Sequence, residues 1–185
     1  MARLTLSLLG PFHVTLNNRT VSSFAYDKVR ALLAYLAVEA DRSHRREALA
    51  EFLWPDQSSA TARHSLSQAL TMLRQAIGDH AATPPYLLTT RESVQFNVAS
   101  DYVVDVTTVV RLIDGCNRHT HPRRETCTSC ARQLEAAVAL YRDAFLSQFT
   151  IGDSAAFEEW ALLRRDWLQQ RVLSALAWLG EYHME

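Results

Sequence analysis

Cysteine and histidine residues form two short pairs within one segment of the chain. Cys116 and His119 are separated by two residues, as are Cys127 and Cys130, and His121 lies between the pairs. Thiolate and imidazole groups at this spacing are typical ligands of a tetrahedral structural zinc. We therefore expect one zinc ion, held by the three cysteines and by one of the two histidines. Two alternatives remain open: a surface loop with unligated thiols, and a redox-active pair.

A second pattern is the absence of acidic residues between Gln57 and Gly78, although the chain carries 20 acidic and 19 basic residues. Exposed helices usually mix both signs, because opposite charges one helical turn apart stabilise each other. The stretch ARHSLSQALTMLR, inside this segment, has helical spacing with leucines along one side. We predict a helix over residues 58–77 that is capped by Ser58 or Ser59 and ends at Gly78.

The opposite side of this predicted helix offers hydrogen-bond donors that suit the edges of DNA bases and the phosphates. An acidic side chain there would meet phosphate at close range, which explains the absence of Asp and Glu. The alternative is a solvated helix that lacks acidic residues by chance. The candidate DNA-binding residues on this face are Arg63, His64, Ser67, Gln68, Thr71 and Arg74.

The segments before this helix predict a small sheet and two shorter helices. Apolar and polar residues alternate over residues 4–16, and the turn pair Asn17-Asn18 follows, which predicts an antiparallel sheet with one apolar face. Apolar spacing predicts one helix near residues 27–37 and another that begins after Ser43 and stops at Trp54.

The segment after this helix predicts a β-hairpin. YLLTT and VQFNV are two short strand-like runs around Arg91-Glu92-Ser93, and the tip of the hairpin is Thr89-Thr90-Arg91. Three helices followed by a hairpin describe a winged helix, in which the third helix enters the DNA major groove. We therefore add Thr90 and Arg91, at the tip of the wing, to the candidate DNA-binding residues.

The chain changes character after residue 100. We expect residues 1–100 to form the winged-helix domain with its amino-terminal sheet, and residues 101–185 to be helical, with the Cys/His loop at 116–130. Helical spacing in the second region predicts paired helices and a long last helix, which resemble the start of a helical repeat array. The expected fold class is α+β.

Composition restricts the function classes. With 48% hydrophobic and 21% charged residues the chain belongs among globular proteins, and no segment approaches the length of a membrane span. The five glycines are scattered, so the sequence lacks a glycine-rich phosphate loop, and we do not expect an enzyme. Net charge is close to zero, so a case for nucleic acid depends on where the basic residues gather. We expect a cytoplasmic location.

Long motifs resemble a known family. LSLLGPFHVTLNNRTV and KVRALLAYLAVEADRSHRREALAEFLWPDQSSATARHSLSQALTMLRQAI are similar to the amino-terminal region of SARP/AfsR-type bacterial transcriptional activators. LEAAVALYRDAFLSQF and DSAAFEEWALLRRDWLQQRVLSAL resemble the start of the bacterial transcriptional activator domain of that family. The resemblance stops at Glu185 within that domain, so we expect a fragment of a larger regulator.

This resemblance implies an OmpR-type winged helix followed by tetratricopeptide-like helices. It also implies an activator that binds double-stranded promoter DNA at direct repeats through helix 58–77 and recruits RNA polymerase. A homodimer on DNA is a further expectation. The alternative from another class is a helical protein-interaction module whose winged helix binds protein rather than DNA.

Overall fold

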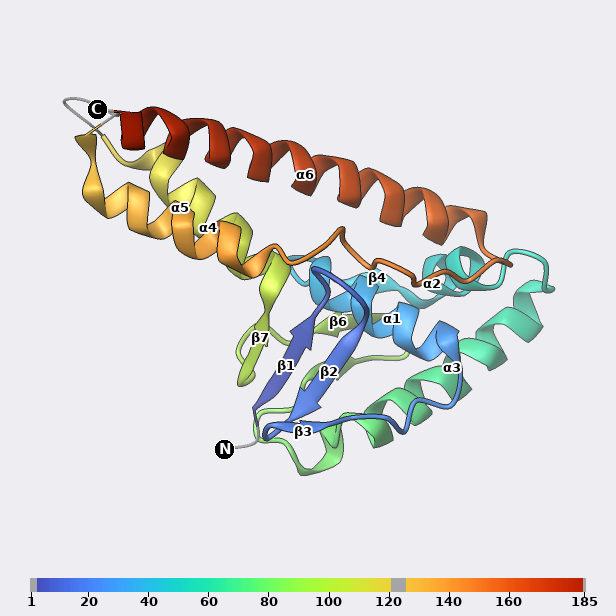
Figure 1. The fold of residues 1–185 in the computed structure, drawn as a ribbon. Coiled ribbons are helices and arrows are strands. Elements are labelled where there is room, and N and C mark those ends of the chain that lie inside the picture. The colour runs from blue at the N-terminus through green and yellow to red at the C-terminus, as the bar shows by residue number, and fades with distance from the viewer. Residues whose placement is uncertain (1–2, 121–125, 185) are drawn as a thin grey trace.

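The computed structural model describes residues 3–120 and 126–184 of the chain. All the strands of the described chain and its first three helices form an amino-terminal part, and the remaining helices lie together along one side of the molecule (Figure 1). The structure is therefore of the mixed α+β class that the sequence predicts, with a sheet and winged helix followed by a helical region.

The amino-terminal sheet has four strands in the order β3-β2-β1-β7. Its strands are β1 (Leu4–Ser7), β2 (His13–Leu16), β3 (Arg19–Thr20) and β7 (Tyr102–Val104). The predicted antiparallel pairing of β1, β2 and β3 is present, and Asn17 and Asn18 form the turn between β2 and β3 with positive φ angles. The strand β7 was not predicted, and it pairs with β1 in parallel, so the sheet is mixed. Three residues are too few for an alternating pattern to be recognised.

The winged helix follows the predicted order of three helices and a hairpin. It contains α1 (Asp27–Val38), β4 (His44–Arg45), α2 (Arg46–Leu53), α3 (Ser59–Ala76), a 3-10 turn η1 (Asp79–Ala81), β5 (Leu87–Thr89) and β6 (Ser93–Phe96). The hairpin of β5 and β6 gains a third strand, because β4 pairs with β6. Since β4 immediately precedes α2, this pairing joins the wing to the start of the second helix.

Local signals set the two ends of α3. The Oγ of Ser58 accepts a hydrogen bond from the Thr61 N–H at 3.3 Å, so Ser58 is the amino-terminal cap. At the other end Gly78 has a φ of 66°, a left-handed conformation that glycine adopts without steric cost. Both ends lie where the sequence predicts them.

The helical part consists of α4 (Asp105–Arg118), α5 (Thr128–Leu140) and α6 (Ala155–Met184). Asp105, at the start of α4, accepts hydrogen bonds from the backbone N–H groups of Leu8 and Leu9, each at 2.9 Å, so α4 is joined to the end of β1. Ser154 caps α6 and also donates its hydroxyl to the Phe52 carbonyl at 2.6 Å. Within the described ranges, every helix falls short of the length or the apolar character that crossing a membrane requires.

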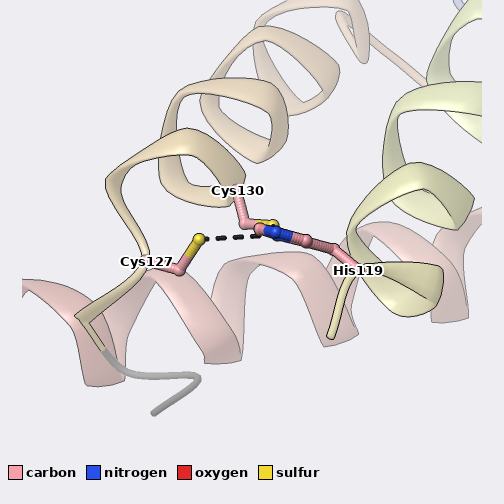
Figure 2. Close-up of side chains that lie close together, drawn as sticks. All are labelled: His119, Cys127 and Cys130. Atoms are coloured by element: carbon pink, nitrogen blue, oxygen red, sulfur yellow. Dashed lines mark hydrogen bonds between the residues drawn. The ribbon is translucent and has the colours of Figure 1, made fainter. Parts of the chain in front are cut away.

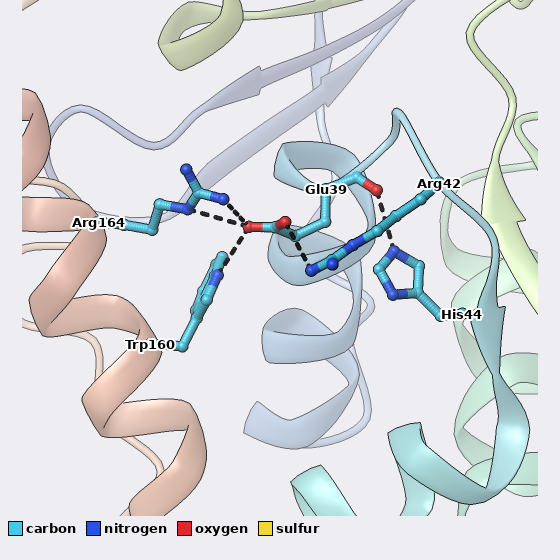
Figure 3. A network of polar contacts seen from close by, with 5 residues as sticks. All are labelled: Glu39, Arg42, His44, Trp160 and Arg164. Carbon is cyan, nitrogen blue, oxygen red and sulfur yellow. Dashed lines mark hydrogen bonds and ion pairs between the residues drawn. The ribbon is translucent and has the colours of Figure 1, made fainter.

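A buried carboxylate joins α6 to the winged helix. Glu39, which ends α1, has a side chain that is only 5% exposed. Its Oε1 accepts hydrogen bonds from Trp160 Nε1 and Arg164 Nε, each at 3.0 Å, and Arg42 Nη2 lies 3.1 Å from Oε2 (Figure 3). Burial raises the pKa of Glu39, but the hydrogen bonds from Trp160 and Arg164 and the two arginine charges outweigh burial. The net pKa of Glu39 is therefore below its ordinary value.

The lowered pKa of Glu39 predicts how stability depends on pH. Because the folded chain binds this proton less tightly than the unfolded chain, ionised Glu39 stabilises the fold above the ordinary glutamate pKa of about 4.3. That contribution is lost as the pH falls through the folded-state pKa. We expect Glu39→Gln to lower the free energy of unfolding at neutral pH by about 1.5–3 kcal/mol. Denaturant titrations at a series of pH values should show this difference shrinking in acid.

The control for this titration is Glu51→Gln, a change of the same chemistry at an exposed position of α2. It should alter stability by less than about 0.5 kcal/mol at every pH. A Glu39→Gln deficit of equal size in neutral and acidic buffer would show that the carboxylate charge contributes nothing.

Candidate functional site

Four arginines line a groove between α2, α3 and the wing, which we call the arginine groove. They are Arg45 and Arg46 from the start of α2, Arg63 from α3 and Arg91 from the wing tip. Glu47, Leu66, Ser67 and Glu92 complete the lining. The groove thus holds four positive and two negative side chains, although the chain as a whole has a net charge of −1. Such a local excess of positive charge can attract a polyanion even when the net charge is near zero.

Arg63 faces this groove from the first half of α3. Its Nε donates to the Ser59 carbonyl at 3.1 Å, and its Nη1 lies 3.3 Å from Glu47 Oε1. Both partners of this ion pair are exposed, at 55% for Arg63 and 63% for Glu47. Exposed pairs of this kind contribute about 0–1 kcal/mol, so an incoming phosphate or base can replace Glu47 at little cost.

The other predicted residues of α3 lie on the same exposed side. The side chains of His64 and Gln68 are hydrogen-bonded to each other at 2.9 Å across one helical turn. Ser67 Oγ donates to the Arg63 carbonyl at 2.9 Å, and Thr71 Oγ1 donates to the Ser67 carbonyl at 3.0 Å. All four residues are exposed, so the structure brings Arg63, His64, Ser67, Gln68 and Thr71 together on one face.

The wing tip is a tight turn shaped by Thr90. Its Oγ1 accepts hydrogen bonds from the N–H groups of Glu92 at 3.1 Å and Ser93 at 2.9 Å. Thr90 was predicted to contact DNA, but its hydroxyl is used to hold the turn. Arg91, the other predicted wing residue, is exposed and lines the arginine groove, so Thr90 acts on the groove by presenting Arg91.

Arg45 and Arg46 belong to the arginine groove but were not recognised from the sequence. The Nη2 of Arg46 donates to Ser67 Oγ at 3.1 Å, and its Nη1 lies 3.5 Å from the Thr90 carbonyl. The guanidinium of Arg46 therefore spans the space between α3 and the wing. A signal was present in the sequence, because RSHRRE places three arginines within six residues around the start of the second helix.

Arg74 does not lie in the arginine groove. Its Nε donates to Asp79 Oδ2 at 2.7 Å, and the carboxylate of Asp79 is fully buried. The other oxygen of Asp79 accepts the backbone N–H groups of Tyr86 at 2.6 Å and Leu87 at 3.0 Å. The sequence placed Arg74 among the phosphate-binding residues, but this geometry makes it a brace between α3 and the start of β5. We therefore leave Arg74 out of the proposed interface.

The second site is a cluster of potential metal ligands at the ends of α4 and α5. The ligand atoms of His119, Cys127 and Cys130 all lie within 4.8 Å of one another. His119 Nδ1 is 3.2 Å from Cys130 Sγ and 3.6 Å from Cys127 Sγ (Figure 2). His119 directly follows α4, Cys127 caps α5 and Cys130 lies in the first turn of α5. These three side chains point toward one another and could hold a metal ion.

Cys116 lies next to this cluster. Its thiol is 3.5 Å from the Cys130 carbonyl and 3.8 Å from Gln133 Oε1. Burial, together with the neighbouring thiols of Cys116 and Cys127, raises the pKa of Cys130 to about 12. The fifth predicted ligand, His121, lies outside the described residues. The structure thus brings three of the five predicted ligands together and places a fourth, Cys116, beside them.

Comparisons with known proteins identify relatives of the winged helix and of the fold. Residues 26–93 match the family model described as "Transcriptional regulatory protein, C terminal". Among solved structures, the fold is similar to that of Mycobacterium tuberculosis EmbR in complex with a low affinity phosphopeptide. The two chains are 23% identical with a TM-score of 0.72, and the similarity covers 100% of this chain and 46% of that chain. A search of curated protein sequences found no significant match.

These findings confirm the resemblance for the winged helix and the fold for the whole chain. The family that residues 26–93 match is one of transcriptional regulatory proteins, and the similarity to EmbR shows the fold. This chain spans less than half the length of the EmbR chain.

The pairing of Arg74 with buried Asp79 predicts that the two arginines of α3 differ in their effect on stability. Arg74→Ala leaves a buried carboxylate with only its backbone donors, so we expect a loss of about 2–4 kcal/mol in the free energy of unfolding. Arg63→Ala, on the same helix, removes only an exposed pair and should cost less than about 1 kcal/mol. Denaturant unfolding of both variants measures the difference, and equal losses would contradict the bracing role of Arg74.

Proposed function

We propose that this chain, a transcription regulator whose residues 26–93 match a DNA-binding domain family, binds double-stranded promoter DNA in a sequence-specific manner. The observation that carries the proposal is the arginine groove, which brings arginine side chains together beside the acid-free face of α3. A helix with such a face fits the major groove, and the arginines beside it would meet the phosphate backbone.

The contacts of the free chain support a division of roles among these side chains. Arg63 and His64 project from the first half of α3, the part that meets base edges in most helix-turn-helix proteins, and Gln68 lies one turn after His64. We assign base contacts to these three side chains. Arg45 and Arg46, at the start of α2, and Arg91, on the wing, flank α3 and are assigned to phosphates. The negative charges of Glu47 and Glu92 repel phosphates that come close to them. This repulsion restricts the positions in the groove that a phosphate can occupy.

Finer parts of the function are extended from the family resemblance. We propose that the chain activates transcription by recruiting RNA polymerase, recognises promoter repeats, binds them as a homodimer and acts in the cytoplasm. The alternative is a protein-interaction module in which the groove binds an acidic protein surface. Salt dependence separates the two, because release of counterions from DNA makes affinity fall steeply with salt concentration.

The DNA-binding proposal predicts the effects of substitutions in the groove. Arg63→Ala should weaken binding to a preferred duplex by about 1–3 kcal/mol and relax the preference at one base pair. Arg46→Ala should weaken all duplexes alike and lower the salt slope by about one. Ser67→Glu should weaken binding further, because the carboxylate would pair with Arg46 and repel phosphate. Fluorescence anisotropy over a range of salt concentrations, with a duplex selected from a random pool, measures all three.

The matched control is Gln169→Glu, which adds the same charge at an exposed position of α6, outside the winged helix. It should retain most of the affinity. If Ser67→Glu remains folded and binds as tightly as Gln169→Glu, then α3 does not contact DNA and the proposal fails.

We also propose that the Cys/His cluster holds a structural zinc ion. In a tetrahedral site with Zn–N near 2.0 Å and Zn–S near 2.3 Å, an imidazole nitrogen and a thiolate sulfur lie about 3.5 Å apart. The two N···S distances of the cluster, 3.2 and 3.6 Å, are close to that spacing. Cys116 is the proposed fourth ligand among the described residues. Zinc would fasten the end of α4 to the start of α5.

The zinc proposal predicts about one equivalent of metal in protein purified without a chelator, measured by mass spectrometry. His119→Gln and Cys130→Ser should lose the zinc and lower the melting temperature, whereas His80→Gln, at an exposed position outside the cluster, should change neither. Less than about a tenth of an equivalent, with no destabilisation by added chelator, would rule the site out.

A further inference from the structure

The loop between α1 and β4, residues 39–44, is fastened on one side to α6. Glu39 begins the loop, and its carboxylate receives hydrogen bonds from Trp160 and Arg164 of α6. The backbone carbonyl of Glu39 accepts a hydrogen bond from Nε2 of His44 at 2.9 Å, at the other end of the loop (Figure 3). One residue therefore contacts α6 through its side chain and the start of β4 through its backbone.

The same connection is reinforced by packed aromatic rings. The ring of His44 lies 5.1 Å from that of Tyr35, and the ring of Tyr35 lies 5.1 Å from that of Trp160. His44 is buried, so its hydrogen bond to Glu39 is protected from water. Because packed rings and buried hydrogen bonds resist gradual deformation, a displacement of α6 would be transmitted to His44.

His44 leads directly into the arginine groove. It forms β4 together with Arg45, and these two residues pair with Val94 and Ser93 of the wing. Arg46 follows, and its backbone N–H donates to the Glu92 carbonyl at 2.8 Å. The position of β4 therefore determines where the side chains of Arg45 and Arg46 start.

Arg46 is sensitive to small shifts of β4. Its guanidinium reaches Ser67 of α3 and the Thr90 carbonyl of the wing, at 3.1 and 3.5 Å. The first distance is within the ordinary range for a hydrogen bond and the second is at its limit, so a shift of β4 would first weaken the contact with the Thr90 carbonyl. In Figure 1, α1 lies between α6 and α3. The residues that line the arginine groove come from β4, α2, α3 and the wing.

We propose that Glu39 is a positioning residue through which the docked α6 sets the placement of Arg45 and Arg46 for DNA. This inference rests on the proposed DNA-binding function and adds its regulation: the helical region supports tight binding by holding β4 in register. A partner that draws α6 away from Glu39 would weaken DNA binding without touching the groove.

The first test is Glu39→Gln, for which this proposal and simple electrostatics predict opposite signs. Removing a negative charge from a DNA-binding chain should leave affinity unchanged or raise it, because the repulsion of phosphate falls. Loss of the positioning contact should instead weaken binding by about 2- to 30-fold. It should also lower the salt slope by about one to two, since Arg45 and Arg46 no longer meet phosphate. The probe is a duplex selected from a random pool by the wild-type chain, with a scrambled duplex for comparison.

The second test asks whether Glu39 and α6 act through one contact. Arg164→Gln should weaken binding to a similar degree, and the double variant Glu39→Gln/Arg164→Gln should be no weaker than the worse single variant. The matched control is Arg132→Gln, which removes the same charge from an exposed position of α5. Fully additive effects, or an equal loss in Arg132→Gln, would overturn the proposal.

A readout without DNA separates failure of this inference from failure of the DNA-binding proposal. Hydrogen exchange of the Arg46 amide, which is bonded to Glu92, should be faster in Glu39→Gln than in the wild type. If the wild type binds no duplex, the proposed function falls, and unchanged Arg46 exchange would overturn the positioning role as well. If Glu39→Gln does not fold, Trp160→Phe removes one donor to Glu39 and carries the same measurements. Folded variants with wild-type affinity, salt slope and Arg46 exchange would end the proposal.

Discussion

A buried carboxylate cannot remain charged unless donors surround it, and Glu39 imposes that constraint on the whole molecule. Its donors come from two directions, with Arg42 in the following loop and Trp160 and Arg164 on α6. The winged helix therefore satisfies this acid only when the helical part is docked beside it. Since the removal of one partner from such a group is costly, the relative placement of the two parts is strongly specified.

The long helix α6 is held at both of its ends. Near its start, Ser154 donates to the Phe52 carbonyl and Trp160 and Arg164 reach Glu39. Near its end, the hydroxyl of Tyr182 is 3.3 Å from that of Thr128, at the beginning of α5. Because the metal-ligand cluster lies at that same end of α5, a metal there would stabilise the helix against which the end of α6 rests.

The proposed DNA-binding surface shows how a chain with almost no net charge can present a basic site. Four arginines converge at one groove beside only two acids, Glu47 and Glu92, while other acids of the winged helix take part in contacts elsewhere. Asp79 is buried beneath Arg74, and Glu39 is turned toward α6. The absence of acids from the face of α3 is thus one part of a wider separation of charge, and local potential matters more than net charge for attracting a polyanion.

The sequence by itself determined the features that depend on residues close along the chain. Each of these features depends on residues within one or two helical turns or within one tight turn. They are the helical spacing, the Ser58 cap, Gly78, the turn at Asn17-Asn18 and the spacing of the Cys/His pairs. Those signals were enough to predict a winged helix, the exposed acid-free face of α3, and the Cys/His residues that the structure brings together or, for Cys116, places beside them.

Tertiary structure decided which partner each polar side chain takes. The spacing of residues along the sequence did not predict three of these contacts. They are the pairing of Arg74 with Asp79, the hydrogen bonds of the Thr90 hydroxyl within the turn, and the position of Arg45 and Arg46 in the groove. The parallel pairing of β7 with β1 joins segments almost a hundred residues apart, and the link from Glu39 to Arg164 spans more than a hundred. Local patterns are set by backbone geometry, which repeats over a few residues. Side-chain partners are chosen when distant segments pack, and only the folded chain brings those segments together.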